Sequence, residues 1–361
     1  MNVLHELWYG DSAAARAARG VLTPASWLYR AGVAVRNWHY DNPDAVCQSA
    51  VPALSLGNLA VGGTGKTPVA AWAAAAVLAR GGSPAIVLRG YGDDESLVHR
   101  RLNPDVPVIV SADRVHGALL ARAAGADCII LDDGFQHRRI ARVSDWVLVP
   151  AETWRDDLSV LPAGPLREPI GACARADVLL ITRKSATRDT AERVATQLSA
   201  RFPGTATAMC HLRLDALVNV VTAERRSLAS LEGRSVLAIA AVGAPDAFFA
   251  QLRSLGAVVQ EYAYRDHHAF SSDDVRRLLA LAATSDVLVC TLKDAVKLAP
   301  RWPPASAPLW YVSQIAVIEH GRSLLDHALE SVLAARQLAS LTAGSAGPST
   351  PGHGHRSSTA D

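Results

Sequence analysis

The chain has 361 residues, of which half are apolar and 19% are charged, with a mean hydropathy of +0.13 and a net charge of +2. This length exceeds what one hydrophobic core usually organises, so we expect two domains. Because acidic and basic residues almost balance, the composition gives no support to a nucleic-acid partner.

The cysteines indicate a reducing compartment. They are scattered along the chain, odd in number and free of any C-x-x-C pair: Cys47, Cys128, Cys173, Cys210 and Cys290. This pattern is typical of reduced thiols in a cytoplasmic protein and argues against a disulfide framework or a zinc site.

No membrane-spanning or secretory segment is expected. Glu6 and Asp11 interrupt the N-terminus where a signal peptide needs an apolar core. The longest uncharged apolar stretch, residues 69–79, is far shorter than the ~20 residues that cross a bilayer.

Residues 1–40 form a segment of their own, and its second half predicts an amphipathic helix. On a helical wheel over 24–40, one face collects Trp27, Leu28, Ala31, Ala34, Val35 and Trp38, while Arg30 and Arg36 lie off it. A helix with tryptophans and basic flanks suits a membrane interface. The alternative is that this face packs on the protein's own core.

Residues 41–212 predict a first α/β domain. Short apolar runs alternate with helical patterns, as in a parallel sheet. The candidate helices are 67–80, closed by Gly81-Gly82, and 115–124, closed by Gly125. The candidate strands are 53–56, 85–88, 106–110, 128–131, 146–149 and 178–181.

The pattern loosens around 205–215, and a second, smaller α/β series follows over 213–336. Ser271 is the expected N-cap of a helix over 275–281. The candidate strands are 235–240, 258–264, 287–291 and 309–312. Residues 343–361 are rich in Gly, Ser, Thr and Pro and predict a disordered tail.

A phosphate-binding loop is the clearest chemical signal. The pattern G-x-x-x-x-G-K-[ST] lets backbone N–H groups and a helix N-terminus surround a triphosphate. Here Ala60 takes the first glycine position, an apolar strand precedes the loop, and an Ala-rich helix with Pro68 in its first turn follows. The predicted ATP-binding residues are Ala60, Val61, Gly62, Gly63, Thr64, Gly65, Lys66 and Thr67.

Such a loop needs an acidic group at a neighbouring strand end to help hold Mg²⁺. Asp132 and Asp133 follow the strand 128–131, and ligands of open α/β sheets bind at that edge. We expect Asp132 and the Thr67 hydroxyl to hold Mg²⁺. Asp133 is a second ligand, orients a neighbour, or caps the following turn.

The residues alone leave several classes of phosphate chemistry open. A GTPase stays a weak alternative because Thr291-Leu-Lys-Asp294 spells T-x-K-D. A nucleotide-driven switch or metallochaperone would use His137, His267 and His268 as metal-handling groups. It is disfavoured because these histidines lack a Cys partner at ligand spacing. A different small-molecule kinase also remains possible.

The chain resembles the tetraacyldisaccharide 4'-kinases of lipid A biosynthesis, over about residues 20 to 335. The matching stretches, in the family's order, are "GNLAVGGTGKTP" (57–68), "RGYG" (89–92), "LDDGFQHRR" (131–139), "LPAGPLREP" (161–169), "RDHHAF" (265–270) and "TLKDAVKL" (291–298). The resemblance implies two α/β domains, one of them P-loop NTPase-like, with the active site in the cleft between them. It also implies an ATP-dependent kinase that phosphorylates the 4'-hydroxyl of a lipid-linked glucosamine disaccharide 1-phosphate at the cytoplasmic face of the inner membrane, without a stable protein partner.

The resemblance also implies catalytic residues. The family's proposed base is the Asp of a Gly-Asp-Glu segment, which maps to Asp94 here. The segment is fused to Arg-Gly-Tyr-Gly as "RGYGDDES" (89–96), so Asp93 competes for this assignment. His267 would support the base from the second domain, and domain closure would bring it to Lys66 and Asp94. Asp133 completes the predicted catalytic set.

Arginines near these motifs are candidates for binding phosphate. Guanidinium groups bind phosphate oxygens bidentately, so Arg138, Arg139 and Arg167 are candidates for the substrate's 1-phosphate or the transferring phosphate. Carboxylate pairing on the surface is the alternative for each. Lys293 and Asp294 are expected to hold the second domain's edge near the nucleotide.

Overall fold

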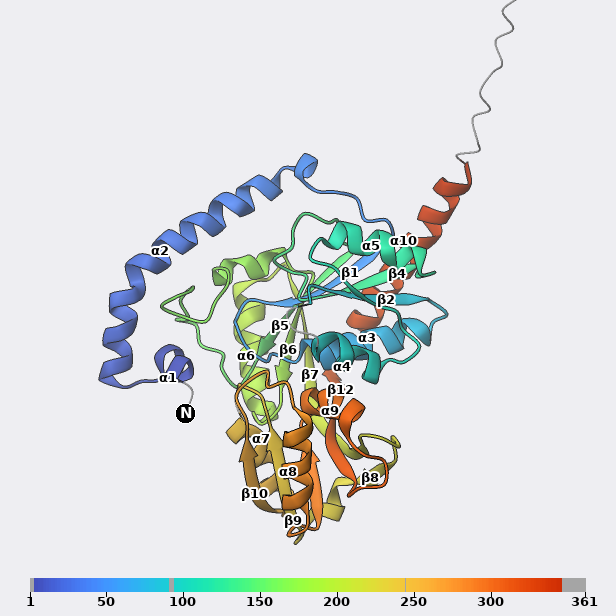
Figure 1. The fold of residues 1–361 in the computed structure, drawn as a ribbon. Helices are drawn as coiled ribbons and strands as arrows, with labels where there is room; N and C mark the ends of the chain where they lie inside the picture. The colour runs from blue at the N-terminus through green and yellow to red at the C-terminus, as the bar shows by residue number, and fades with distance from the viewer. Residues whose placement is uncertain (1–2, 91–93, 244, 346–361) are drawn as a thin grey trace, which may run out of the picture.

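The computed structural model describes residues 3–90, 94–243 and 245–345 (Figure 1). These residues form a 12-stranded sheet in the order β10-β9-β11-β12-β7-β6-β5-β1-β4-β2-β3, with β8 beside β7. Every pairing is parallel except β12 with β7 and β7 with β8. The predicted fold class, mixed α/β with a mostly parallel sheet, is confirmed.

The strands of the N-terminal body are almost wholly buried, which explains their continuous apolar runs. All six candidate strands of this part are present, with the third shortened to three residues. They are β1 (Ala53–Asn58), β2 (Pro84–Leu88), β3 (Val108–Val110), β4 (Cys128–Asp132), β5 (Ser144–Pro150) and β6 (Val178–Arg183).

Helices cover both faces of these strands. The two predicted helices are present within one or two residues as α3 (Lys66–Leu78) and α5 (Arg114–Ala123). The sequence did not predict α4 (Asp94–Leu102), which follows β2. The helix α3 covers one face of the sheet, whereas α5, the short 3-10 helix η2 (Ile170–Arg175) and α6 (Arg188–Arg201) cover the other.

The C-terminal body contains three parallel strands and three helices, drawn in yellow and orange in Figure 1. The capping box that Ser271 forms with Asp274 starts its second helix, as predicted for that position. The elements are the 3-10 helix η3 (Leu228–Leu231), β9 (Ser235–Ala240), α7 (Pro245–Ser254), β10 (Val258–Ala263), α8 (Ser272–Ala282), β11 (Val287–Cys290), α9 (Leu292–Leu298) and η4 (Ala299–Arg301).

Two long antiparallel strands join the bodies. They are β7 (Ala206–Asn219), with the short β8 (Arg225–Ser227) at its side, and β12 (Leu309–His320). The expectation that the pattern loosens over 205–215 was wrong, because these residues continue one strand of 14 residues. The proposed domain boundary at residue 212 therefore lies inside β7.

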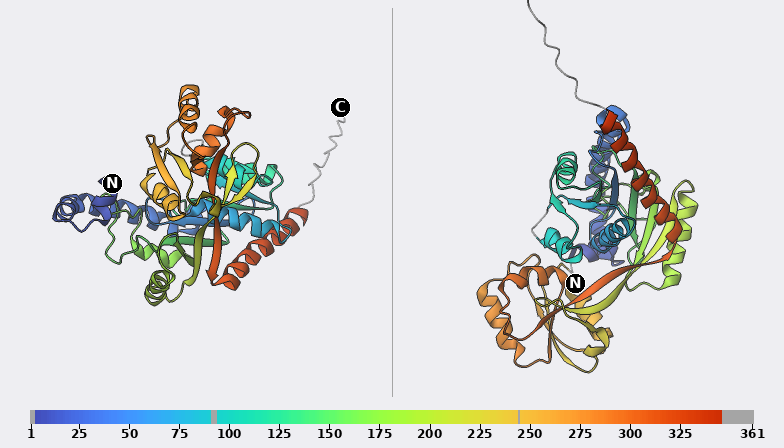
Figure 2. Two further views of the ribbon diagram at one scale, coloured as in Figure 1. Left: turned by 90° about the horizontal axis from the view of Figure 1, so that it is seen from below. Right: turned by 90° about the vertical axis from the view of Figure 1, so that its right-hand side faces the viewer.

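The C-terminal helix α10 (Arg322–Ser345) returns to the N-terminal body, as the right-hand view of Figure 2 shows. Leu325, Leu329 and Val332 lie one to two turns apart and are buried in the core that also contains α3. Residues 322–336, assigned from sequence to the second domain, thus pack with the first. The helix extends to Ser345, so residues 343–345, predicted as part of a disordered tail, are helical, and residues 346–361 lie outside the described residues.

The N-terminus forms α1 (Val3–Tyr9) and the long α2 (Ala13–Asp41), which runs along the outside of the N-terminal body (Figure 1) and leads into η1 (Pro43–Ala45). Ser12 caps α2 by accepting a hydrogen bond from the Ala15 N–H. Among the described residues, no helix is both long and apolar enough to cross a membrane.

Candidate active site

The candidate site lies at the carboxyl ends of β1 and β4, which are neighbours in the sheet. The turn after β4 packs tightly on β1: a Cβ at Gly57 would lie 2.4 Å from the Phe135 Cβ. The Gly134 N–H donates to the Leu56 carbonyl, and the Gln136 side chain donates to the Asn58 carbonyl. This close approach brings the acidic pair 132–133 beside the phosphate loop, as predicted.

The phosphate loop, residues 60–67, depends on glycine at its end. Gly65 has φ of 90°, and a Cβ there would lie 2.1 Å from Leu212 of β7. Ala60, at the first glycine position of the pattern, is buried and bridges to Leu166. Thr67 is the second residue of α3.

Two further groups hold the loop from β6 and the turn after it. The Thr182 hydroxyl donates to the Thr64 carbonyl, and Lys184 Nζ donates to the Gly63 carbonyl at 2.7 Å. Burial lowers the pKa of Lys184. Glu152, which accepts from the backbone N–H groups of 184–186, fixes this turn in place.

Lys66, Asp133 and Arg167 form a charged cluster at the loop. Lys66 Nζ lies 3.4 Å from Asp133 Oδ1 and donates to the Asn58 amide oxygen at 3.1 Å. Arg167 Nη1 contacts both oxygens of Asp133, at 2.9 and 2.8 Å. Burial acts to raise the pKa of Asp133, but Lys66 and Arg167 outweigh it, so the pKa is lowered. Asp133 also has an uncommon φ of 56°.

Asp132 is the better-placed of the two carboxylates for a metal ion. It is 5% exposed, and its Oδ2 lies 2.7 Å from Nε2 of the fully buried His99. Among the described residues, Asp132 Oδ1 has no hydrogen-bond partner. A buried carboxylate oxygen without a partner fits a hard cation such as Mg²⁺, which prefers oxygen ligands.

Asp94 and His267 meet across the two bodies. Asp94 is the first residue of α4 and 3% exposed, whereas His267 belongs to the turn after β10 and has φ of 58°. His267 Nδ1 lies 3.3 Å from Asp94 Oδ2, and Lys297 Nζ of α9 lies 3.5 Å from the same oxygen. Neither Asp94 oxygen has a hydrogen bond within the described part of the chain. Asp93 lies outside the described residues.

The residues next to Asp94 connect it to the phosphate loop. Burial, followed by the negative charge of Asp132, raises the pKa of Glu95, while Lys293 and Lys66 act in the opposite direction. Asp294 is buried and accepts from the Thr291 hydroxyl and the Ala241 N–H, so it holds α9 against β9, and burial raises its pKa. The charges of Lys293 from the C-terminal body and Lys66 from the phosphate loop thus both act on Glu95.

Two of the three candidate phosphate-binding arginines are engaged elsewhere. Arg138 donates to the carbonyls of Asn37 and Tyr40 and pairs with Asp41, so it fixes the end of α2. Arg139 pairs with Asp113 at the surface. Only Arg167 is directed at the cluster around the phosphate loop.

The histidines of the metal-handling alternative are not brought together. His268 pairs with Asp274 at 3.0 Å and stacks on Tyr264, which are contacts within the C-terminal body. His137 has a pKa lowered to about 4, mainly by burial and then by Arg114. The described residues contain no group of three or more His, Cys, Asp or Glu side chains that could hold a metal ion.

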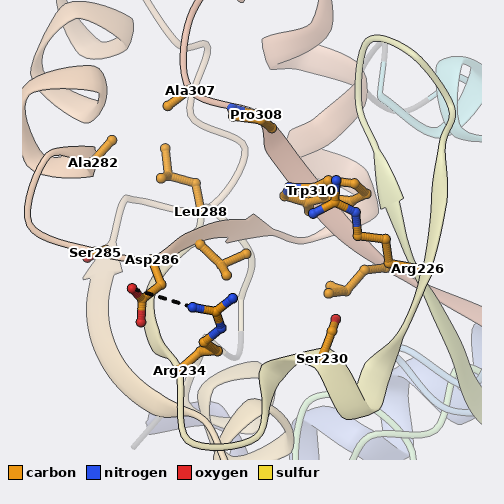
Figure 3. A pocket seen from close by; sticks show the side chains of 12 residues that line it. Arg226, Ser230, Arg234, Ala282, Ser285, Asp286, Leu288, Ala307, Pro308 and Trp310 are labelled. Carbon is orange, nitrogen blue, oxygen red and sulfur yellow. Dashed lines mark ion pairs between the residues drawn. The ribbon is translucent and has the colours of Figure 1, made fainter.

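A cavity of about 180 Å³ lies away from this site (Figure 3). Arg226 covers the Trp310 ring there, and Arg234 lies 3.9 Å from Asp286. Arg234 and Asp286 directly precede β9 and β11, so this cavity is at the amino ends of strands whose carboxyl ends face Asp94.

Sequence reasoning missed His99, Lys297, Lys184 and Asn58. Lys297 and Asn58 lie inside the "TLKDAVKL" and "GNLAVGGTGKTP" stretches, so the motifs themselves could have drawn attention to them. His99 and Lys184 carry no such signal, because their contacts depend on where α4 and the turn after β6 lie.

Comparison with known proteins agrees with this geometry. A sequence model of the family described as tetraacyldisaccharide-1-P 4'-kinase matches residues 18–334. A tetraacyldisaccharide 4'-kinase of Anaeromyxobacter sp. (strain Fw109-5) is 35% identical over 377 residues, covering 95% of this chain and 100% of the relative. That of Halorhodospira halophila is 34% identical, covering 84% and 90%.

A solved structure is also similar. The "apo" form of LpxK from Aquifex aeolicus, crystallised in complex with ATP, superposes with a TM-score of 0.70 at 26% identity, covering 87% of this chain and 99% of that one. Since the family model spans most of the chain and the relatives align along nearly their whole length, the chain belongs to the tetraacyldisaccharide-1-P 4'-kinase family.

Proposed function

We propose that this chain transfers the γ-phosphate of ATP to the 4'-hydroxyl of a tetraacylated glucosamine disaccharide 1-phosphate, with Asp94 as the base. Membership of the family makes the chain an ATP-dependent kinase of lipid A biosynthesis. The observation that carries the residue assignment is the meeting of Asp94 and His267, 3.3 Å apart, from opposite bodies.

The phosphate loop would hold the nucleotide. Its backbone N–H groups and the N-terminus of α3 favour phosphate oxygens. Lys66, now paired with Asp133 and Asn58, lies where it can exchange these partners for the β- and γ-phosphates. Arg167 would then keep Asp133 in place, or share the transferring phosphate with Lys66.

Asp132 and Thr67 are the residues that would hold Mg²⁺. The partnerless Asp132 Oδ1 supports this assignment. When bound, the ion supplies charge neutralisation at the β- and γ-phosphate oxygens. Asp133, tied to two cations, is better suited to orienting Lys66 and Arg167 than to binding the metal.

Asp94 would accept the proton of the sugar hydroxyl as the new O–P bond forms. Its own contacts with His267 and Lys297 keep the carboxylate in one position, which matters because phosphoryl transfer depends chiefly on positioning and charge. His267 is 56% exposed in its side chain, so it can be reached from solvent and pass the proton on.

The apolar face of α2 would place the enzyme on the cytoplasmic surface of the inner membrane. All six residues of the face predicted from sequence are exposed, including Trp27 at 67% and Trp38 at 77%. The opposite face is held down: the Ser26 hydroxyl donates to the Val160 carbonyl, and the Tyr29 hydroxyl donates to the Arg167 carbonyl. Packing on the protein's own core therefore does not account for the exposed face, and this exposure supports a role at a membrane interface.

The test is direct transfer of label. The purified chain is incubated with Mg²⁺, γ-labelled ATP and a tetraacylated disaccharide 1-phosphate in detergent micelles, beside Lys66→Ala and Asp94→Asn. Label in the lipid, lost in both variants, is the expected result. Transfer retained by Asp94→Asn would move the base to Asp93 or His267. An unlabelled lipid with continuing ATP hydrolysis would overturn the proposed acceptor.

A further inference from the structure

His99 is a buried histidine for which the proposed reaction has no role. It lies on α4, five residues after Asp94, and its side chain is completely buried. Its Nε2 lies 2.7 Å from Asp132 Oδ2, while its Nδ1 is buried and has no hydrogen-bond partner among the described residues.

The hydrogen-bond partner of Nε2 determines which nitrogen of the His99 ring carries a proton. Asp132 Oδ2 is an acceptor, so the contact requires a proton on Nε2. The contact therefore fits an imidazole that donates from Nε2 to the carboxylate.

Because of this hydrogen bond, the two carboxylate oxygens of Asp132 have different surroundings. Oδ2 is occupied by His99, and Oδ1 is buried without a partner. We propose that His99 is a positioning residue for the metal site: it fixes the Asp132 carboxylate so that Oδ1 alone faces the Mg²⁺ of Mg²⁺–ATP. This inference rests on the metal-binding role proposed for Asp132.

The helix α4 also connects the proposed metal site with the proposed site of the sugar hydroxyl. Asp94 begins α4 and His99 lies on its second turn, so one short helix carries the proposed base and the residue that holds the metal-binding carboxylate. Outer hydrogen-bond partners of metal ligands typically change metal affinity by about 10- to 100-fold when they are replaced.

The test measures binding of Mn²⁺, standing in for Mg²⁺ and visible by electron paramagnetic resonance, to the full chain with a non-hydrolysable ATP analogue. His99→Gln retains an N–H donor with a reach close to that of Nε2, and His99→Met fills similar volume without a donor. His99→Asn keeps the amide but is one methylene shorter. We expect wild-type affinity within about threefold for Gln, and a loss of about 10- to 100-fold for Met and Asn.

The controls separate the failure of this inference from failure of its premise. Thermal unfolding checks that each variant is folded, and the Gln–Asn comparison remains informative if Met does not fold. If Met and Asn bind Mn²⁺ as tightly as the wild type while Asp132→Asn does not, the positioning role of His99 is wrong and the metal role of Asp132 stands. If Asp132→Asn also binds Mn²⁺ as tightly as the wild type, then Asp132 does not hold the metal ion, and the positioning role of His99 is wrong as well. Lipid phosphorylation, assayed separately, tests the proposed reaction independently of both.

Discussion

His267 Nδ1 lies 3.3 Å from Asp94 Oδ2 although the two residues belong to different bodies of the molecule. The turn after β10 carries the histidine, and the start of α4 carries the aspartate. The long strands β7 and β12 join the two bodies in one sheet. A carboxylate that is 3% exposed thus lies beside an imidazole from the other body, which is an arrangement suited to accepting and passing on a proton.

If the pair acts as a unit, its members should not contribute independently. We expect Asp94→Asn to lower kcat by about 10²- to 10⁴-fold, and His267→Gln to lower it less. The double variant should be no slower than Asp94→Asn alone, because the histidine acts through the carboxylate. Asp273→Asn, whose side chain is 75% exposed on α8, is the matched control. Losses that multiply in the double variant would show that the two residues act separately.

Lys297 is expected to stabilise the contact between the bodies. Its Nζ lies 3.5 Å from the buried Asp94 Oδ2, so Lys297→Met leaves that carboxylate with fewer compensating charges. Removing one partner of a buried pair costs about 3–5 kcal/mol, and the partial exposure of Lys297 should reduce this to roughly 2 kcal/mol. Urea unfolding measures the loss. Lys293→Met, one turn earlier on α9, controls for removing a lysine; an equal loss in both variants would contradict the specific contact.

Much of this architecture was predictable because buried parallel strands have a distinctive local pattern. The strands β1, β4 and β6 are continuous apolar runs, and the loop 60–67 is specified by its own residues. By contrast, β7 has two buried stretches, 208–210 and 216–219, separated by a more polar middle that includes His211 and Arg213, and that polar content hid a long strand. The helix α4 is short and strongly charged, so its tertiary contacts decide its position more than its pattern does.

The residues of the candidate site likewise include some that the sequence predicts and some that only the fold identifies. Lys66 and Asp132 follow from the loop motif and the strand end, and the family resemblance added Asp94 and His267. The roles of Arg138 and Arg167 could not be separated from sequence, since both are arginines beside matching motifs. Only the fold directs one toward Asp41 and the other toward Asp133.

This difference predicts unequal effects of replacing arginines. Arg167→Met should lower kcat/KM by about 10- to 100-fold, because Asp133 loses a charge-assisted partner whose Nη1 contacts both of its oxygens beside Lys66. Arg139→Met removes only a surface pair with Asp113 and should leave activity within about twofold. Steady-state kinetics with both ATP and lipid varied makes the comparison. An equal loss of kcat/KM in both variants would indicate that Arg139 binds phosphate too.

His137 should make stability depend on pH. Its pKa is lowered to about 4 in the folded chain from 6.5, mainly by burial and then by Arg114. Between these values the unfolded chain binds the proton and the folded chain does not, so this residue reduces stability as pH falls from about 6.5 toward 4. The effect should be on the order of 1 kcal/mol between pH 7 and pH 5 after allowing for solvent screening.

Urea unfolding of the wild type and His137→Gln at pH 7 and pH 5 measures this contribution. The variant should lose less stability than the wild type when the pH is lowered. His39→Gln, on the exposed part of α2, is the control for removing a histidine. A wild type and His137→Gln variant with the same pH dependence would mean that His137 is freely protonated in the folded chain.

The exposed face of α2 gives the last prediction. Trp27 and Trp38 are 67% and 77% exposed, eleven residues apart on one face, with Leu28 and Val35 between them. Burying such a face in the interfacial region of a bilayer is favourable, and aspartates would oppose both the apolar contact and anionic lipid. Trp27→Asp/Trp38→Asp should therefore abolish co-sedimentation with anionic vesicles while ATP binding is unchanged, since both side chains lie on the exposed face of α2.

Leu119→Asp provides a matched control, because Leu119 is a 52% exposed apolar residue on α5, on a different part of the surface. It should sediment with vesicles as the wild type does. The double variant should also phosphorylate a lipid acceptor in detergent micelles nearly normally but one embedded in vesicles poorly, because only the second requires the membrane surface to be reached. Unchanged vesicle binding by the double variant would assign the exposed face of α2 to another role.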